Sequence, residues 1–577
     1  MPDSKTAHRP NGPTGGAALW HSIDWKLEEA SVRRLRQRIY RATRAGDMKQ
    51  VRNLQKLMLR SRANTLVSVK RVTQRSAGRK TAGVDGKTAL TPAARGGLTK
   101  EVLERPAIPP KPVKRVFIPK SNGKRRPLGI PVIRDRVNQA RVKNALEPEW
   151  EARFEPRSYG FRPGRSTHDA IGRIFVTVGK KNAKRLWVLD ADLSAAFDRI
   201  SHEHLMNQLG LFPGREQIRG WLTAGVLEDG RFSYTPEGTP QGGVISPLLL
   251  NVALHGMGEV VKRPGKRPRD RDDPSPILVR YADDFVVMCE TKEEAEECKN
   301  RLAEWLAPRG LSFNEEKTRV CHLEDGYDFL GFNVRRYGIK LLIKPSKAAV
   351  QRAKDRIREI VRSCRGQPAS VLINQLNPFI RGWSTYYRHV VSKDIFDKLD
   401  DRTYIALRRW ALRSHGNKTH GWVMRRYWGR RNPERADNWV FGADGRYLRK
   451  FRWTAIVRHV MVKGGSSPDD PELEKYWRSR TQKRLPETES KQILRLAYRQ
   501  KGLCTKCGTD LIEGAGFDPD DVNDWARWFT ASMRAIHVHH LVYRSKGGSD
   551  RLSNLEVIHA ECHRQHHAGD RSRNATA

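Results

Sequence analysis

The chain has 577 residues, which is too many for one compact core, so we expect several domains. Lys and Arg number 109 against 64 Asp and Glu, which gives a formal net charge of +45. Nucleic acid is the polyanion that such a charge predicts as partner. No apolar stretch approaches the roughly 20 residues that a membrane-spanning helix needs. The 7 cysteines do not suggest a disulfide scaffold. We therefore expect a cytoplasmic, reducing location without a membrane partner.

The first 19 residues are polar and rich in Pro and Gly, which predicts a disordered tail. Residues 20–108 are predicted to form a basic helical extension. Between residues 31 and 80 the only acidic residue is Asp47, and apolar residues keep helical spacing. We expect amphipathic helices with one packed face and one face that binds phosphates; a merely solvated charged face is the alternative.

Short β-rich runs alternate with helical stretches from residue 109 to residue 342. This alternation predicts an α+β region in which helices back an antiparallel sheet. Ser121-Asn122-Gly123 is a hairpin signal. The expected strands cover residues 113–119, 186–189, 277–280, 285–288 and 329–334, and helices are expected at 292–306 and 345–365.

Residues 401–485 are basic and contain widely spaced tryptophans. Arg beside aromatic rings suits stacking on bases and binding of nucleic-acid backbones, although any single Trp is more often a core residue. Residues 463–471 have the composition of a linker. Residues 486–577 then contain clustered Cys and His.

Tyr281-Ala282-Asp283-Asp284 lies between two apolar runs, which places adjacent carboxylates at the tip of a predicted hairpin. Crowded carboxylates repel each other, and a shared divalent cation resolves the repulsion. Phosphoryl transfer to a 3′-hydroxyl uses two such cations, and hard oxygen ligands select Mg²⁺. The alternative is an Asp-Asp loop without a ligand.

A third carboxylate must come from elsewhere in the chain. Asp190 and Asp192 end an expected strand and share one face by period-two alternation, so geometry alone allows either.

Cys504 and Cys507 have the Cys-x-x-Cys spacing of half a zinc site. The matching half is His559 and Cys562 in place of a second cysteine pair. Imidazole binds Zn²⁺ as thiolate does, so we expect a Cys₃His site with one structural Zn²⁺. A chance cysteine pair is the alternative.

From about residue 20 to the end, the chain resembles the proteins encoded by bacterial group II introns, which join a reverse transcriptase and maturase to an HNH endonuclease. The resemblance implies a multidomain α+β protein: a right-hand polymerase with fingers and palm at 109–342, a thumb or maturase domain X at 343–400, a DNA-binding region at 401–485, and a ββα-metal HNH nuclease at 486–577. The motifs that carry it lie at 126–131, 158–166, 192–198, 238–247, 310–318, 329–332 and 377–388.

The resemblance also implies roles for single residues of the polymerase. The family's first palm motif places the metal-binding acid five positions before an aromatic residue, which selects Asp192 over Asp190 and makes Phe197 the residue that disfavours a 2′-hydroxyl. Asp192, Asp283 and Asp284 would then hold two Mg²⁺ ions. Contacts to the dNTP and template would come from Lys120, Arg126, Phe197, Gln241 and Lys317.

The nuclease residues are implied in the same way. His540 would be the general base, a role that suits a side chain titrating near neutrality, and Asn554 would orient the loop. His539, His563 and His567 would bind one catalytic divalent metal, with His566 as a substitute for His567.

The function that follows is that of a ribonucleoprotein enzyme. It would bind group II intron RNA to assist splicing, nick target DNA with the HNH unit and reverse transcribe the RNA from that primer, consuming dNTPs. The alternatives are a maturase without active polymerase, a retron-type or CRISPR-linked reverse transcriptase, an RNA-templated RNA polymerase, and a protein that keeps only the endonuclease. Intact Asp192, Asp283 and Asp284 disfavour the first.

Overall fold

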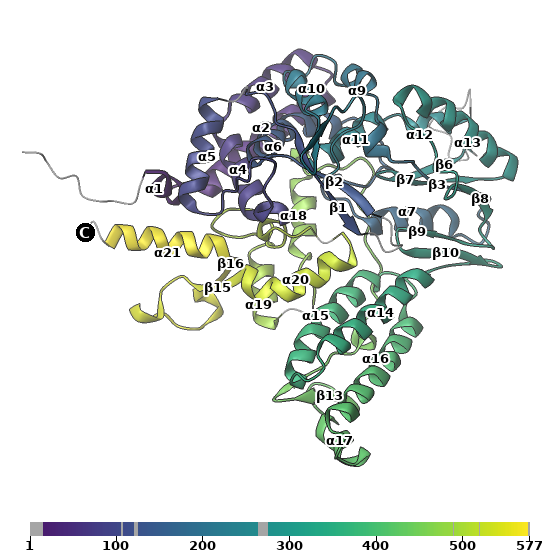
Figure 1. Cartoon of the computed structure of the whole chain (residues 1–577), viewed down its shortest axis with the longest axis vertical. Coiled ribbons are helices and arrows are strands. Elements are labelled where there is room, and N and C mark those ends of the chain that lie inside the picture. Colours follow the sequence, from purple (N-terminus) through teal and green to yellow (C-terminus); the bar gives the residue numbers. More distant parts are fainter. Residues whose placement is uncertain are drawn as a thin grey trace, which may run out of the picture.

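The computed structural model describes residues 15–105, 108–119, 125–263, 275–487, 490–518 and 520–574. Figure 1 shows the sheets of the central region in an upper part, a helical lobe below it, and C-terminal elements between and beside the two. No helix within these ranges is both long and apolar enough to cross a membrane.

The N-terminal extension is a group of helices, as its spacing predicts. Asp24 and Asp47 cap two of them by accepting hydrogen bonds from backbone amides of the first turn, which satisfies donors that a helix start leaves free. The first helix begins at Gly15, so the expected disordered tail does not extend to residue 19. The helices are α1 (Gly15–His21), α2 (Trp25–Arg44), α3 (Met48–Arg60), α4 (Arg62–Lys70) and α5 (Pro92–Glu104).

The fingers contain a four-stranded sheet in the order β2-β1-β4-β5. The first two strands form the predicted antiparallel pair, while the expected turn at Ser121-Asn122-Gly123 lies outside the described residues. The strands are β1 (Val113–Pro119), β2 (Arg125–Ile130), β4 (Val226–Glu228) and β5 (Arg231–Ser233). The helices of the fingers and palm are α6 (Ile133–Glu151), α7 (Thr167–Val178), α8 (Ala196–Arg199), α9 (His202–Leu209), α10 (Arg215–Thr223), α11 (Ser246–Ala253), α12 (Met257–Val260) and α13 (Lys292–Leu306).

The palm sheet has the order β6-β7-β3-β8, and all neighbouring strands are antiparallel. Alternate residues of its strands belong to two different cores: Leu189 and Val287 face one, and Val188 and Val286 face the other. The sheet is therefore buried on both faces, which makes it a rigid support for its loops. Its strands are β3 (Trp187–Asp192), β6 (Ile277–Tyr281), β7 (Asp284–Cys289) and β8 (Arg319–His322).

A second palm sheet, ordered β11-β10-β9, connects to the thumb. The single strand expected over 329–334 is wrong: β9 (Tyr327–Phe329) and β10 (Phe332–Tyr337) are two antiparallel strands. Leu330 and Gly331 turn between them with φ of 51° and 82°. The apolar pattern continues through the turn, so it gave no sign of a break. The third strand is β11 (Lys340–Pro345).

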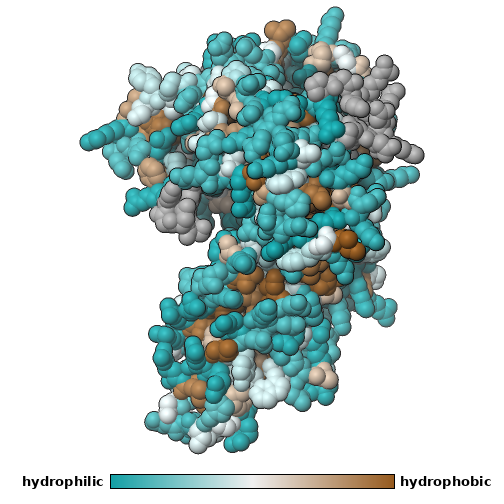
Figure 2. Space-filling model, turned by 90° about the vertical axis from the view of Figure 1, so that its right-hand side faces the viewer, coloured by the Kyte–Doolittle hydropathy of each residue, from teal (hydrophilic) through white to brown (hydrophobic). Residues whose placement is uncertain are grey.

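The thumb is the helical lobe at the bottom of Figure 1. Its third helix runs without interruption through residues 400 and 401, where the thumb was expected to end. A small sheet, ordered β12-β13-β14, follows. Figure 2 shows a mostly hydrophilic face, with hydrophobic residues gathered where this lobe joins the upper part. The elements are α14 (Lys347–Ser363), α15 (Ala369–Tyr387), α16 (Lys393–Ser414), α17 (His420–Tyr427), β12 (Trp428–Gly429), β13 (Val440–Ala443) and β14 (Arg446–Tyr447).

The C-terminal unit contains a two-stranded antiparallel sheet followed by a helix, as a ββα fold requires. It shares one hydrophobic core with the N-terminal extension, since Trp20 and Trp25 pack in the same cluster as Leu496 and Trp528. Its elements are α18 (Glu474–Gln482), α19 (Lys491–Arg499), α20 (Val522–Ala535), β15 (Ile536–His540), β16 (Leu555–His559) and α21 (Ala560–Asn574).

Candidate functional sites

Tyr281-Ala282-Asp283-Asp284 is the turn between β6 and β7, as predicted. Tyr281 ends one strand and pairs with Asp284, which begins the next. Ala282 adopts φ of 58°, in the left-handed region that non-glycine residues rarely occupy. The tight turn places both carboxylates at the end of a sheet that is buried on both sides.

The third carboxylate comes from β3, which lies beside β7. Asp192 is directly opposite Asp284 in the strand register. Asp190 pairs with Val286 farther from the turn, and its carboxylate lies 3.5 Å from the Arg319 guanidinium. Of the two aspartates that the strand pattern left open, Asp192 is therefore the one beside the turn.

Burial and the close approach of three carboxylates make the ionised form of these aspartates unfavourable. Burial, with Asp283 and then Asp192 beside it, raises the pKa of Asp284 to about 8, and burial also raises the pKa of Asp283. The Lys317 ammonium donates to Asp192 Oδ2 at 2.5 Å. Three oxygen donors with an unfavourable mutual charge fit hard divalent cations.

Phe197 lies in the short helix α8, and Gln241 lies on a neighbouring loop of the same region. The Phe197 ring is buried and meets the Phe161 ring edge to face at a centroid distance of 6.2 Å. The Phe197 carbonyl accepts a hydrogen bond from the Thr239 amide, which connects it to the loop of Gln241. The Gln241 carbonyl in turn accepts from the Gly129 amide at 2.7 Å. Two blocks that are far apart in sequence thus meet beside the palm.

Of the two cationic side chains predicted to bind the dNTP in the fingers, the structure describes one. Arg126 is exposed on β2, and its charge lowers the pKa of Asp283, although burial outweighs this effect. Lys120 lies outside the described residues.

Arg280 is a palm residue that sequence reasoning missed. Its side chain is 1% exposed, directly before the turn. Its Nη1 donates to the Ala282 carbonyl at 3.1 Å and to Asn251 Oδ1 at 2.9 Å, and Asn251 Nδ2 donates to the Gly160 carbonyl at 2.9 Å. The available signal was a charged residue inside an otherwise apolar strand.

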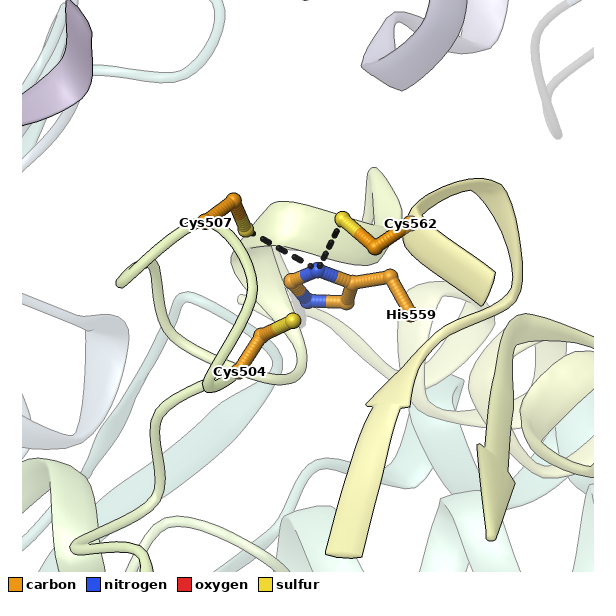
Figure 3. A group of neighbouring side chains, drawn as sticks. All are labelled: Cys504, Cys507, His559 and Cys562. Atoms are coloured by element: carbon orange, nitrogen blue, oxygen red, sulfur yellow. Dashed lines mark hydrogen bonds between the residues drawn. The ribbon is translucent and has the colours of Figure 1, made fainter. Parts of the chain in front are cut away.

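The predicted Cys₃His site is assembled. Cys504, Cys507, His559 and Cys562 are all buried, and their ligand atoms lie within 4.8 Å of one another. Figure 3 shows the four side chains converging from the loop after α19, the end of β16 and the start of α21. Hydrogen bonds from Cys504 and Cys562 hold the pKa of the Cys507 thiol well below its ordinary value, which favours the thiolate that binds metal. The donor set fits Zn²⁺.

The structure also assembles the predicted nuclease ligands. His539, His563 and His567 form the second group of potential ligand atoms within 4.8 Å among the described residues. The group contains His567, whereas His566 lies beside it with its ring 5.0 Å from that of His539. The three polymerase aspartates do not form a third group of this kind in the described chain. Burial lowers the pKa of His539 and of His563 to about 4, so both imidazoles are neutral and free to coordinate.

His540 and Asn554 lie on the loop side of the same hairpin. His540 Nε2 is 2.8 Å from Asp550 Oδ1, a partner that the sequence analysis did not name. The Asn554 side chain accepts from the Val542 amide and donates to the Val542 and Ser549 carbonyls, so it closes the loop between β15 and β16.

A basic groove lies between two thumb helices, α14 and α16. It encloses about 1120 Å³, and no acidic residue lines it. Trp410 and Tyr427 also line it. The cationic residues along it are Lys354, Arg358, Arg362, Arg365, Arg402, Arg409 and Arg413.

The C-terminal unit touches the polymerase turn. The Tyr281 hydroxyl donates to Asp520 Oδ2, and the Thr167 amide donates to Asp520 Oδ1 at 3.0 Å. Helix α20, which follows Asp520, packs against thumb helix α15 so closely that a Cβ on Gly382 would lie 2.5 Å from the Ala526 amide nitrogen. Palm, thumb and nuclease unit are therefore in direct contact.

Four family models match the chain in order. They are the N-terminal domain of reverse transcriptase at 20–102, reverse transcriptase (RNA-dependent DNA polymerase) at 118–334, the group II intron maturase-specific domain at 350–428, and HNH endonuclease at 527–569.

Two curated relatives match part of the chain. Protein YkfC of Escherichia coli (strain K12) is 36% identical over 317 residues, which are 48% of this chain and 82% of that protein. Group II intron-encoded protein LtrA of Lactococcus lactis subsp. cremoris is 30% identical over 39% of this chain, and the match spans about half (47%) of LtrA. Among solved structures, an apo telomerase from Candida tropicalis matches 41% of this chain and 55% of that chain, with 16% identity and a TM-score of 0.31.

The polymerase, maturase and nuclease domains thus occur together on one chain. The domains are those of an RNA-directed DNA polymerase and an endonuclease, in families that bind intron RNA and DNA and use divalent metals. The chain belongs to the group II intron-encoded proteins that combine a reverse transcriptase and maturase with an HNH endonuclease.

Proposed function

We propose that this chain binds its own intron RNA, nicks one strand of a target DNA with the HNH unit, and extends the resulting 3′-hydroxyl along the RNA. The observation that carries the proposal is the meeting of Asp192 with Asp284 across the palm strands, within a matched reverse transcriptase domain. A maturase without polymerase activity would have no need to keep three carboxylates at this position.

For polymerisation, Asp192, Asp283 and Asp284 would hold two Mg²⁺ ions. When bound, the ions supply activation of the attacking hydroxyl and stabilisation of the leaving phosphate. Lys317, which neutralises Asp192 in this structure, would turn toward substrate phosphate when the cations take over its role.

Substrate contacts would come from the residues around the palm. Arg126 and Lys120 would bind the triphosphate of the dNTP, and Gln241 would contact nucleotide and template. Phe197 would exclude a 2′-hydroxyl by the bulk of its buried ring.

For DNA cleavage, His540 would accept the proton of the attacking water at one imidazole nitrogen. Asp550 holds the ring in place and stabilises the imidazolium that forms, because its carboxylate is 2.8 Å from Nε2. His539, His563 and His567 would bind one divalent metal, which supplies charge stabilisation at the cleaved phosphate. An all-imidazole site favours transition metals over Mg²⁺. Cys504, Cys507, His559 and Cys562 would bind a structural Zn²⁺ that ties the nuclease hairpin to its supporting loop.

Two regions would contact nucleic acid: the groove between α14 and α16, and the region that follows it in the chain. The arginine-lined groove of α14 and α16 suits the phosphodiester backbone of intron RNA. The region after it would hold target DNA, and Trp439 there is 61% exposed and free to stack, whereas Trp410 and Trp428 are core residues.

Primer extension by the full chain tests the polymerase part of the proposal. A DNA primer annealed to a short RNA template is supplied with dNTPs and Mg²⁺. We expect the parent to make cDNA and Asp283→Ala to lose about 1000-fold or more in rate. Asp190→Asn is the matched control, since this acid lies two residues before Asp192 and faces Arg319. Absence of cDNA from the parent would refute the polymerase.

Nicking of duplex DNA tests the other part. His540→Ala should abolish nicking while leaving extension of a preformed primer unchanged, because the two sites use separate ligands. If His540→Ala nicks DNA as the parent does, its role as general base is wrong.

A further inference from the structure

Arg280 is a buried cation directly behind the polymerase turn. Its position in β6 faces the protein interior, with 1% of the residue exposed. Burial lowers the pKa of this guanidinium to about 10, so it still carries its charge at neutral pH. Burying a charge is unfavourable unless the charged group is paired or hydrogen-bonded, so the contacts of Arg280 indicate its role.

These contacts converge on the backbone of the turn. Arg280 Nη1 donates both to the Ala282 carbonyl, at 3.1 Å, and to Asn251 Oδ1, at 2.9 Å. The Ala282 carbonyl belongs to the peptide that joins Ala282 to Asp283. Holding it fixes the direction in which the chain enters the two catalytic aspartates.

The turn needs such support because it is strained and crowded. Ala282 has φ of 58°, a conformation that persists in a non-glycine residue only when its surroundings enforce it. The loop before α7 packs closely against it: a Cβ on Gly160 would lie 2.4 Å from the Ala282 amide nitrogen. Asn251 completes the frame, since its Nδ2 donates to the Gly160 carbonyl.

The guanidinium is not used in an ion pair. Among the described residues no carboxylate forms a salt bridge with Arg280, although Glu155 and Asp283 attract it. Glu155 instead accepts from the Gly256 amide at 2.6 Å and pairs with His255. Arg280 Nη1 therefore bonds the carbonyl of the turn and Asn251, and not a carboxylate.

We propose that Arg280 is a positioning residue for polymerisation: through the Ala282 carbonyl and Asn251 it holds the left-handed turn that aims the Asp283 and Asp284 carboxylates. The proposal rests on the polymerase function proposed above. Arg280 touches neither substrate nor metal and acts only through the geometry of the turn.

The test compares two buried arginines in the full chain. Arg280→Gln removes the guanidinium at the turn. Arg336→Gln is the matched control, because Arg336 is 5% exposed on β10 and donates to the carbonyls of Val178, Lys180, Lys181 and Gly338, away from the palm turn. We expect Arg280→Gln to lower kcat for dNTP addition about 100-fold with KM for dNTP within about threefold. Arg336→Gln should lower only the melting temperature.

A metal-binding readout separates this inference from the polymerase proposal. Mn²⁺ binding is measured by electron paramagnetic resonance, and the Asp283→Ala spectrum is subtracted so that binding at the nuclease histidines cancels. We expect Arg280→Gln to bind Mn²⁺ at the palm about tenfold more weakly than the parent. Arg280→Lys, which keeps a charged donor, should fall between the two in both readouts.

Unchanged kcat and Mn²⁺ affinity in Arg280→Gln, or in Arg280→Lys if the former does not fold, would overturn the positioning role. A parent that makes no cDNA would refute the polymerase proposal, and the Mn²⁺ comparison would still decide on Arg280.

Discussion

Phe197 allows a prediction at the scale of one side chain. Its ring is 9% exposed and wedged against Phe161, close to the strand end that carries Asp192. We expect Phe197→Val to open space for a ribose 2′-hydroxyl and to raise the rate of ribonucleotide relative to deoxyribonucleotide insertion by about tenfold or more. Single-nucleotide extension with rNTP and dNTP in parallel measures the ratio. Phe175→Val, at an exposed ring, is the control, and an unchanged ratio in Phe197→Val would exclude the steric role.

The residues that could be predicted are those whose chemistry is local in sequence. Asp283 and Asp284 are adjacent between apolar runs, and Cys504 and Cys507 have a metal-binding spacing that is visible in the sequence. Arg280 could not be assigned, because its partner Asn251 lies 29 positions away in a helix. The same holds for Asp550, which becomes relevant only when the hairpin loop folds back on His540.

At the scale of elements, the thumb groove supports a prediction about RNA binding. Arg362 and Arg409 line it from α14 and α16, and neither forms an ion pair within the described chain. We expect Arg362→Gln with Arg409→Gln to weaken binding of the intron RNA about tenfold at moderate salt and to reduce the slope of log affinity against log salt by about 1–2. Filter binding over a salt series measures both quantities.

The control is a double variant that removes the same number of positive charges outside the groove. Arg356→Gln with Arg219→Gln removes two exposed arginines that already pair with Glu359 and Glu216, outside the groove. Equal losses in both double variants would mean that RNA binding follows net charge and not the groove.

Elements with a regular pattern and clear ends could be predicted closely. The helix expected at 292–306 is α13, and Thr291 caps it through the Glu294 amide. Predictions failed where the pattern continued past a real boundary. The apolar run 329–334 hides the turn at Leu330 and Gly331, and α16 carries its helical pattern through the expected domain boundary at residue 400.

At the scale of the whole molecule, the order of domains along the chain differs from their packing. Trp25 Nε1 donates to Gln565 at 2.6 Å, so the first and last helical regions are bonded to each other. Residues 463–471, expected to be a linker, include the buried Asp469, whose carboxylate holds Arg36 of α2 at 2.7 Å. Such contacts join residues hundreds of positions apart, and a single sequence carries no local sign of them.

The contact of Asp520 with the palm makes the joint between nuclease unit and polymerase dependent on pH. Burial raises the pKa of Asp520 from 3.8 to about 6, and the anions Asp521 and Asp169 add to the shift, while the Thr167 amide opposes it. The folded state therefore holds a proton at pH 4–6 that the unfolded chain has released. The contribution of Asp520 to the free energy of unfolding therefore falls as pH rises through that window. Above about pH 6 the buried carboxylate is ionised, and its full destabilising effect is present.

Asp520→Asn removes the ionisation and keeps an oxygen that accepts from the Thr167 amide. We expect the free energy of unfolding of the variant to be about 1 kcal/mol higher than that of the parent at pH 7.5, and the difference to be smaller at pH 5. Urea titration at the two pH values measures this. Asp518→Asn, whose side chain is 86% exposed, should show no pH-dependent gain. An equal difference at both pH values would mean that the charge of Asp520 does not limit the joint, because only a titrating group makes the difference change with pH.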